Sequence, residues 1–173
     1  FYIYIFFSTL FFLFPLPVTI IIIINGFFFK ELGFYISILQ IIFGSVFLNL
    51  FSKKIKNIFN FKVSKKIKSK LSNLRKISEN NFSIFLSRYL LPYFFHNIYY
   101  GLTKVKLLKF IIIVILSEIP LIFAFNSIGS SLNRISFDYS ASVYTLFKDI
   151  NFYIPFLIIF IVFALANYLD KKK

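Results

Sequence analysis

The sequence predicts an all-α integral membrane protein, and three observations carry that prediction. Hydrophobic residues make up 59% of the 173 positions and charged residues only 15%, whereas globular domains are about a quarter charged. The apolar residues also lie in long uncharged blocks, which are residues 1–29, 32–51 and 150–169. Twenty helical residues reach about 30 Å, which is the hydrocarbon thickness of a bilayer. We expect a single domain over residues 1–173.

The first uncharged block predicts the end of one span followed by a broken segment. Residues 1–14 begin inside an apolar run without a Met, so we expect that this span lacks its start. A signal peptide is less favoured, because no basic leader precedes the run and no small-residue cleavage site follows it. Pro15 and Pro17 then disfavour a continuous helix, and Asn25 with Gly26 predicts a turn.

Residues 32–51 predict a clean span that begins near Gly33, and a basic segment follows at residues 53–80. Within that segment the apolar side chains recur at three- and four-residue steps, which predicts a helix with one apolar stripe lying on an anionic membrane surface. A solvated helix that packs on its own protein is equally open. The lysines expected to face the membrane surface are Lys53, Lys54, Lys65, Lys66, Lys68 and Lys70.

A second broken segment follows the basic one. Residues 89–103 are uncharged, and as one helix they would reach about 22 Å, which is short for a crossing. Pro92 lies near the start of this segment and Gly101 near its end. The length and the two helix-breaking residues favour a re-entrant segment, which enters the bilayer and returns.

Charge placement leads to the same prediction. Loops rich in Lys and Arg stay in the cytoplasm, so we place residues 53–76 and the C-terminal lysines there. Residues 110–133 and 150–169 form two predicted crossings, so the lysines before the first and after the second share one side. A full crossing by residues 89–102 would put both groups of lysines outside. We therefore predict that residues 89–102 enter and leave from the cytoplasmic side.

The two broken segments share a spacing, because Pro17 and Gly26 are nine residues apart, as are Pro92 and Gly101. With residues 32–51 crossing inward, the first segment enters from the opposite face to the second. The predicted fold is therefore an inverted repeat of a re-entrant hairpin plus a transmembrane helix, with further transmembrane helices. That layout is typical of proteins that move a substrate through the bilayer midplane.

Two stretches resemble the conserved blocks of the DedA superfamily, also called the VTT or SNARE-associated Golgi protein family, in its Golgi-type branch. They are "FPLPVTIIIIINGFFFKELG" and "SRYLLPYFFHNIYYGLTKVKLLKFIIIVILSEIPLIFAFNSIGSSL", and the likeness covers residues 14–132. Six positions fall at the intervals of that family: Arg88, Pro92, Asn97, Gly101, Pro120 and Gly129.

The resemblance implies a VTT-type membrane domain whose two re-entrant hairpins meet at mid-depth, and it implies lipid handling. Members are implicated in scrambling phospholipids or in moving polyprenyl-phosphate carriers, and some are proposed to be proton-coupled. This chain departs from the pattern twice. Pro17-Val18-Thr19 holds no carboxylate where many bacterial members carry one, and Glu118 stands where the Golgi-type branch often has Gly. We therefore do not transfer a proton-coupled mechanism.

Two charged residues in apolar surroundings are candidates for the function. Arg88 precedes the second hairpin, and its guanidinium could hold a lipid phosphate through two hydrogen bonds. The alternative is an arginine that reaches the head groups, or one that pairs structurally with Glu79 or Glu118. Glu118 is the only acid within an apolar run, and ionisable groups in that setting are usually functional. A proton relay is one role for it, and a structural ion pair or hydrogen bond is the favoured one.

Asn25 and Asn97, one in each hairpin, are candidates for satisfying backbone groups where the helix breaks, with contact to a lipid head group as the alternative. His96, the only histidine, is expected to be an interfacial or hydrogen-bonded residue rather than a ligand. The residues expected to shape the hairpins are Pro15, Pro17, Gly26, Gly33, Pro92, Gly101, Pro120 and Gly129.

The leading functional hypothesis is a lipid scramblase or flippase that acts on phospholipid or polyprenyl-phosphate. The alternatives are a proton- or ion-coupled transporter of a small solute and a non-transporting membrane-organising protein. An enzyme is not expected, because one His, no Cys and no carboxylate near Glu118 leave neither a triad nor a metal cluster. We expect no cofactor.

Nucleic acid is not an expected partner despite the net charge of +14, because the aromatic residues do not alternate with the basic ones. The expected partners are membrane lipids with anionic head groups, and a homo-oligomer is left open. We place the chain in a bacterial inner membrane, with an organelle membrane of an AT-rich eukaryote as the alternative.

Overall fold

The computed structural model describes residues 1–59, 81–103 and 105–137, together with six positions between 153 and 164. Within these ranges the chain forms helices and no strand, which confirms the all-α prediction. Several predictions lie outside the described residues: most of the basic segment with Lys65, Lys66, Lys68 and Lys70, the loop from 138 to 149, and most of the span at 150–169.

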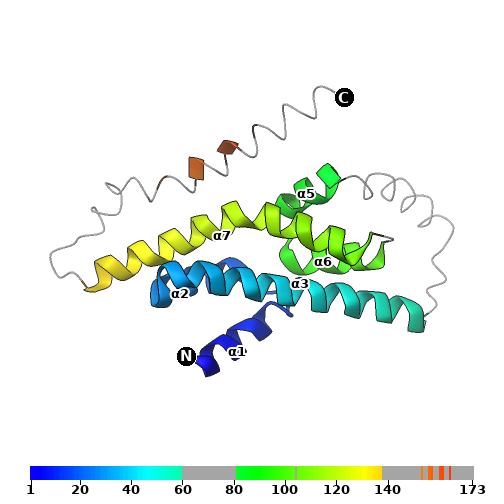
Figure 1. Ribbon diagram of the computed structural model, residues 1–173, viewed down its shortest axis with the longest axis horizontal. Helices are drawn as coiled ribbons and strands as arrows, with labels where there is room; N and C mark the ends of the chain where they lie inside the picture. The colour runs from blue at the N-terminus through cyan, green and yellow to red at the C-terminus, as the bar shows by residue number, and fades with distance from the viewer. Residues whose placement is uncertain are drawn as a thin grey trace. The chain divides into compact units, whose positions relative to one another are not determined.

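The first half of the described chain holds α1 (Tyr2–Phe11), α2 (Val18–Phe29) and α3 (Glu31–Phe59), which Figure 1 shows in blue to cyan. Pro15 and Pro17 lie in the connection between α1 and α2. Because proline lacks the amide N–H that a helix interior needs, the helix breaks here as predicted. α3 extends beyond the predicted span at its C-terminal end.

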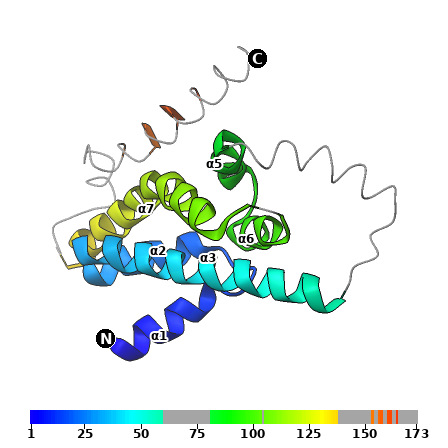
Figure 2. The same ribbon diagram turned by 45° about the vertical axis from the view of Figure 1, so that its right-hand side comes forward.

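The second half repeats this order with α5 (Asn81–Leu90), α6 (Tyr93–Leu102) and α7 (Leu107–Phe137). Pro92 separates α5 from α6 with an extended backbone, φ −56° and ψ 144°. The stretch from Tyr89 to Leu102 is therefore two helices joined at a break (Figure 2) and not one continuous rod. Each half runs short helix, proline, short helix, turn, long helix.

The prediction of a turn at Asn25 and Gly26 is wrong, because both residues lie inside α2. The turn falls at Lys30 instead, which has a φ of 52° in the left-handed region. The carbonyl of Lys30 accepts a hydrogen bond of 2.9 Å from Nδ2 of Asn126 on α7. Gly26 is needed for close packing, since a Cβ on it would meet the backbone of Asn126.

Four further residues expected to shape the hairpins also lie inside helices, namely Gly33, Gly101, Pro120 and Gly129. Gly101 is in the last turn of α6, and Pro120 is inside α7, which continues through it to Phe137. The crossing predicted for residues 110–133 lies within this single helix. A proline within a helix removes one backbone hydrogen bond, so its effect on α7 is local.

The chain divides into two compact units, and both long helices contribute to each. The first unit is Phe1–Pro17 with Gln40–Ser117, so it holds α1, α5, α6, most of α3 and the start of α7. The second unit is Val18–Leu39 with Glu118–Lys173, so it holds α2, the start of α3 and most of α7.

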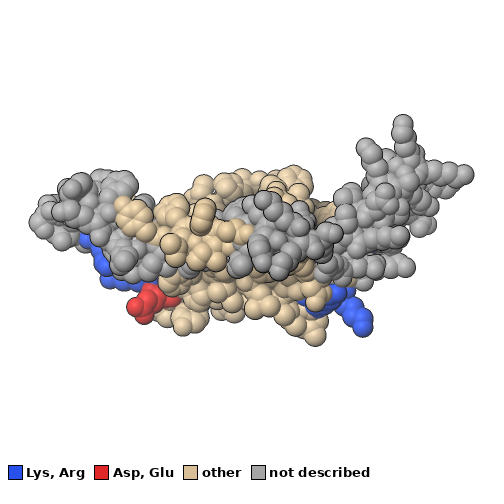
Figure 3. Space-filling model, turned by 90° about the horizontal axis from the view of Figure 1, so that it is seen from above, with Lys and Arg blue, Asp and Glu red and all other residues tan. Residues whose placement is uncertain are grey.

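Many polar side chains are buried beside an apolar core, and many large apolar side chains are exposed, which is unusual for a soluble domain. The surface carries many Phe, Leu, Ile and Tyr residues, and on the face in Figure 3 the charged atoms of the described part are few. The buried polar and charged residues are Ser8, Asn25, Ser37, Gln40, Ser45, Asn49, Ser52, Arg88, His96, Asn97, Ser117, Glu118, Asn126 and Ser131.

Two helical stretches, Glu31–Ile55 and Leu107–Ser136, are long and apolar enough to cross a bilayer. Only 39% of the most apolar window in each is buried. A core helix of a soluble protein is mostly buried, so the outward-facing apolar surface of these two helices favours contact with lipid.

Candidate functional site

Arg88 lies in the last turn of α5, directly before the break at Pro92. Its side chain is only 7% exposed. The guanidinium carbon lies 5.0 Å from the ring centroid of Tyr93, which is the distance of a cation–π contact. Its Nη1 atom lies 3.4 Å from the carbonyl oxygen of Leu91. The break between α5 and α6 therefore holds a buried positive charge.

Tyr93, the first residue of α6, is fixed on several sides. Its hydroxyl donates a hydrogen bond of 2.9 Å to the carbonyl of Ile41 and lies 3.1 Å from Oγ of Ser45. Its ring packs edge-on against Phe12 at 5.7 Å. A Cβ on Gly44 would lie 2.5 Å from the Tyr93 hydroxyl, so glycine is what leaves room for it. Tyr93 thus anchors the α5–α6 break to α3.

Sequence reasoning missed Tyr93, although one signal could have found it. Tyr93 directly follows Pro92 and stands five positions after Arg88, the charged residue that precedes the second broken segment. An aromatic ring next to a buried guanidinium is a common way to stabilise the charge. The sequence alone cannot show that the ring and the guanidinium meet.

His96 occupies a packed position in the core of the first unit. Its Nε2 lies 3.2 Å from the carbonyl oxygen of Ile84, and because that oxygen can only accept, Nε2 carries the hydrogen. The imidazole lies 4.8 Å from the Tyr100 ring and stacks at 5.6 Å on Phe110. These contacts join α5, α6 and α7, which is a structural task.

Asn97 and Asn49 place two fully buried amides where α6 packs on α3. Nδ2 of Asn97 donates to the carbonyl of Tyr93 at 2.8 Å, while its Oδ1 has no hydrogen-bond partner. Both amide atoms of Asn49 are also without a partner. A Cβ on Gly101 would lie 2.7 Å from the backbone oxygen of Asn49, so the two helices are in close contact. We call this contact the α3–α6 seam, formed by Ser45, Asn49 and Ser52 with Tyr93, Asn97 and Gly101.

Asn49 was not among the predicted site residues. Its side chain is an amide within the uncharged run at residues 32–51. A polar residue in a predicted membrane span indicates a functional or hydrogen-bonding position. Asn49 could therefore have been predicted as a site residue, because Leu and Phe surround it in the sequence.

In the second unit Asn25 belongs to a local hydrogen-bond chain. Its Nδ2 donates to Oγ of Ser37 at 2.8 Å, and that hydroxyl donates to the carbonyl of Gly33 at 2.8 Å. A Cβ on Gly33 would meet the backbone of Asn25. The chain ties α2 to the start of α3.

Glu118 is also in the second unit, where it is 1% exposed on α7. Gly129 lies further along the same helix, and a Cβ there would meet the backbone of Ile23 and Phe27 on α2. The α2–α7 contact of the second unit therefore depends on glycine, as the α3–α6 seam of the first unit does.

The structure thus brings together three of the predicted site residues, Arg88, His96 and Asn97, in the first unit. Asn25 and Glu118 are in the second unit. Arg88 and Asn97 share a neighbour, because both contact Tyr93. Lys53 and Lys54 are on α3, half-buried and exposed respectively, and the other four predicted surface lysines lie outside the described residues.

Comparisons of the chain with protein-family models, with curated proteins and with solved structures found no match. The resemblance to the DedA superfamily therefore remains a prediction from the sequence.

Proposed function

We propose that the chain moves lipid head groups across a bilayer, as a scramblase or flippase of phospholipid or polyprenyl-phosphate. A phosphate-bearing head group is expensive to transfer into hydrocarbon unless polar groups replace its water. Buried polar side chains behind an apolar surface offer that replacement. The acyl or prenyl tail would stay in the lipid beside the exposed Phe, Leu and Ile side chains.

The observation that carries the proposal is the buried guanidinium of Arg88 at the α5–α6 break. Arginine binds phosphate through two parallel hydrogen bonds. A charged residue within an apolar stretch lowers stability, so its presence there usually indicates a function. The Tyr93 ring at 5.0 Å holds the guanidinium without carrying a charge of its own.

The proposed path needs helices that do not cross the whole bilayer. α2 has 12 residues and α6 has 10, so they reach about 18 Å and about 15 Å, which is less than the hydrocarbon thickness. We propose that each of these two helices is one arm of a re-entrant hairpin, one hairpin from each leaflet. We place residues 53–76 and the C-terminus on the cytoplasmic side of a bacterial inner membrane, because loops rich in lysine stay there.

The test is lipid equilibration in liposomes that hold the purified protein and a phospholipid with a fluorescent acyl chain. A membrane-impermeant reductant quenches the label in the outer leaflet, and continued quenching reports transfer from the inner leaflet. We expect Arg88→Ala to slow transfer strongly and Arg88→Lys to slow it less, because lysine keeps the charge but loses the two-pronged geometry. Arg134→Ala, at an exposed position of α7, is the control. Transfer by Arg88→Ala at the wild-type rate would remove Arg88 from the mechanism.

The second candidate is a proton- or ion-coupled transporter, which the burial of Glu118 favours. Coupling predicts that transfer depends on an imposed proton gradient and is lost in Glu118→Gln. Scrambling predicts the same rate with and without the gradient, so the liposome assay separates the two functions.

A further inference from the structure

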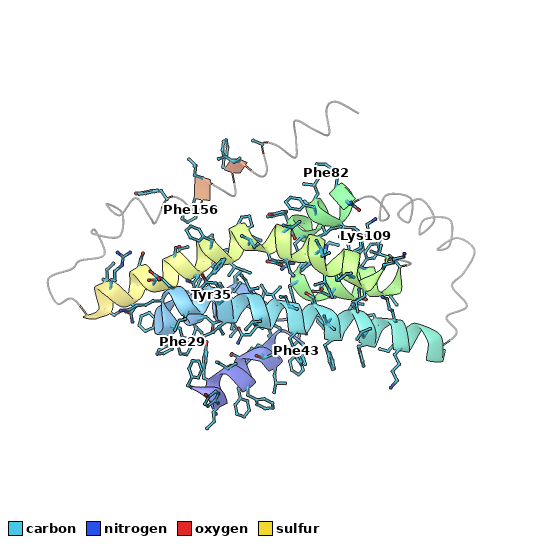
Figure 4. All side chains as sticks on the ribbon, viewed as in Figure 1. Phe29, Tyr35, Phe43, Phe82, Lys109 and Phe156 are labelled. Carbon is cyan, nitrogen blue, oxygen red and sulfur yellow. The ribbon has the colours of Figure 1, made fainter. Side chains whose placement is uncertain are left out.

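The helix α3 presents one polar row and one apolar row. Its polar row is buried, with each side chain at most 2% exposed, and consists of Ser37, Gln40, Ser45, Asn49 and Ser52. Its apolar row is 45–67% exposed and consists of Tyr35, Leu39, Phe43, Phe47 and Phe51. Figure 4 labels Tyr35 and Phe43 of the apolar row. Apart from the five-residue step from Gln40 to Ser45, the members of each row are three or four residues apart, which places them along one side of a helix.

The polar row is long enough to cover a large part of the bilayer thickness that a lipid head group must cross. Within the first unit the polar row runs from Gln40 to Ser52, a rise of about 18 Å, which is more than half of the hydrocarbon thickness. On the apolar row the rings of Phe43, Phe47 and Phe51 stack in sequence, with centroids 6.4 and 6.1 Å apart. That row suits lipid tails, while the polar row suits a head group.

Most members of the polar row have a hydrogen-bond partner. Ser8 on α1 accepts a bond of 2.7 Å from Gln40, Tyr93 lies 3.1 Å from Ser45, and Ser52 donates to a carbonyl of its own helix at 2.7 Å. Asn49 differs, because neither of its amide atoms has a partner. A buried polar group without a partner costs about 1–3 kcal/mol, so this position needs an explanation.

The α3–α6 seam places a second amide opposite Asn49. Tyr93 reaches Ser45 at one end of the seam, and Gly101 touches the backbone of Asn49 near the other end. Asn97 lies on the same face of α6, one helical turn from each. Its Oδ1 is buried without a hydrogen-bond partner, as both amide atoms of Asn49 are.

We propose that α6 moves away from α3 to admit the lipid head group along the polar row, and that Asn49 and Asn97 bind that head group where the closely packed seam opens. Asn49 Nδ2 would donate to a phosphate oxygen, and the two amide oxygens would accept from the water that accompanies it. This inference rests on the proposed function and names the surface along which the phosphate moves after it leaves Arg88.

The chain has no cysteine, so a single introduced cysteine is its only thiol. We would compare Ser45→Cys, Asn49→Cys and Ser52→Cys on the polar row with Phe43→Cys, Phe47→Cys and Phe51→Cys on the apolar row of the same helix. The probe is a charged, membrane-impermeant methanethiosulfonate added to liposomes. Labelling of the polar row alone is expected, because a thiol in hydrocarbon neither ionises nor meets a charged reagent. Labelling of the apolar row alone, or of neither row, overturns the inference.

A second measurement separates a head-group contact from a structural role. Leucine has the branching and the number of heavy atoms of asparagine. Asn49→Leu removes only unpartnered atoms and should melt at or above the wild-type temperature, whereas Asn97→Leu also loses the hydrogen bond to the Tyr93 carbonyl and should melt near it. We expect each to transfer lipid about fivefold more slowly, the effect of one lost hydrogen bond. Phe47→Leu is the control and should transfer lipid normally. Leucine variants that match the wild-type rate overturn the inference.

Different results would contradict the proposed head-group path and the proposed function. If the wild-type protein transfers lipid while the polar row stays unlabelled, the path is elsewhere and the proposed function stands. If the wild-type protein transfers no lipid, the proposed function is wrong whatever the labelling pattern.

Discussion

The backbone oxygen of Asn49 on α3 lies 2.7 Å from the position that a Cβ on Gly101 of α6 would occupy. The second unit contains a matching relationship, since a Cβ on Gly26 of α2 would meet the backbone of Asn126 on α7. In each unit a glycine of a short helix thus lies against an asparagine of the long helix from the other half of the chain. The inverted repeat with re-entrant hairpins itself stays a prediction from the sequence.

The contact at Gly101 predicts the effect of a single methyl group. In a free helix Gly101→Ala would stabilise by about 1 kcal/mol, but here the added Cβ meets the Asn49 backbone, and overpacking costs about 1–3 kcal/mol. We expect a lower melting temperature in detergent for Gly101→Ala and a further drop for Gly101→Leu. Phe95→Leu, on the exposed side of α6, is the control. A melting temperature above wild type for Gly101→Ala would contradict the close packing.

Tyr93 is expected to position Arg88 through its ring more than through its hydroxyl. Tyr93→Phe removes the contacts to Ile41 and Ser45 but keeps the ring, whereas Tyr93→Leu also removes a cation–π contact of about 0.5–2 kcal/mol. We expect lipid transfer to fall modestly in the first variant and strongly in the second. Phe95→Leu, at an exposed position of the same helix, is the control. Equal rates in the Phe and Leu variants would show that the ring does not position Arg88.

The left-handed conformation of Lys30 predicts a stabilising substitution. A residue with a Cβ at a φ of 52° is strained by about 1 kcal/mol, and glycine is not. Lys30→Gly should therefore raise the melting temperature, while Lys30→Ala keeps the Cβ and should leave it near the wild-type value. A lower melting temperature for Lys30→Gly would indicate that the turn between α2 and α3 lies elsewhere.

The imidazole of His96 is expected to contribute to packing and not to lipid transfer. Phenylalanine would keep the contacts with the Tyr100 and Phe110 rings and would lose only the hydrogen bond to Ile84, at a cost of about 1 kcal/mol. We expect His96→Phe to melt slightly lower and to transfer lipid at close to the wild-type rate. Loss of transfer with an unchanged melting temperature would instead give the imidazole a part in the mechanism.

The helix breaks could be predicted from the sequence, because proline acts on its own backbone. Pro17 and Pro92 lie at breaks wherever the rest of the chain packs. The turn at Gly26 could not be predicted in this way, since glycine serves equally for a turn and for close approach of another helix. Asn126, which decides between these two uses, is 100 positions away in the sequence.

The candidate site was predictable in part for a similar reason. Arg88 and Asn97 stand out because they are polar residues in an apolar stretch. Tyr93 does not stand out among the 11 Tyr and 28 Phe of this chain. Only the contacts with Arg88, Ile41 and Ser45 distinguish its ring from the many that face outward.

The most direct test of the central claim is the extent of label quenching in liposomes that contain the wild-type protein and a fluorescent phospholipid. If the protein moves lipid head groups across the bilayer, we expect an impermeant reductant to remove the label from both leaflets when the protein is present, and from the outer leaflet alone in protein-free liposomes. Quenching that stops at the outer-leaflet share in intact liposomes with the folded protein would contradict it.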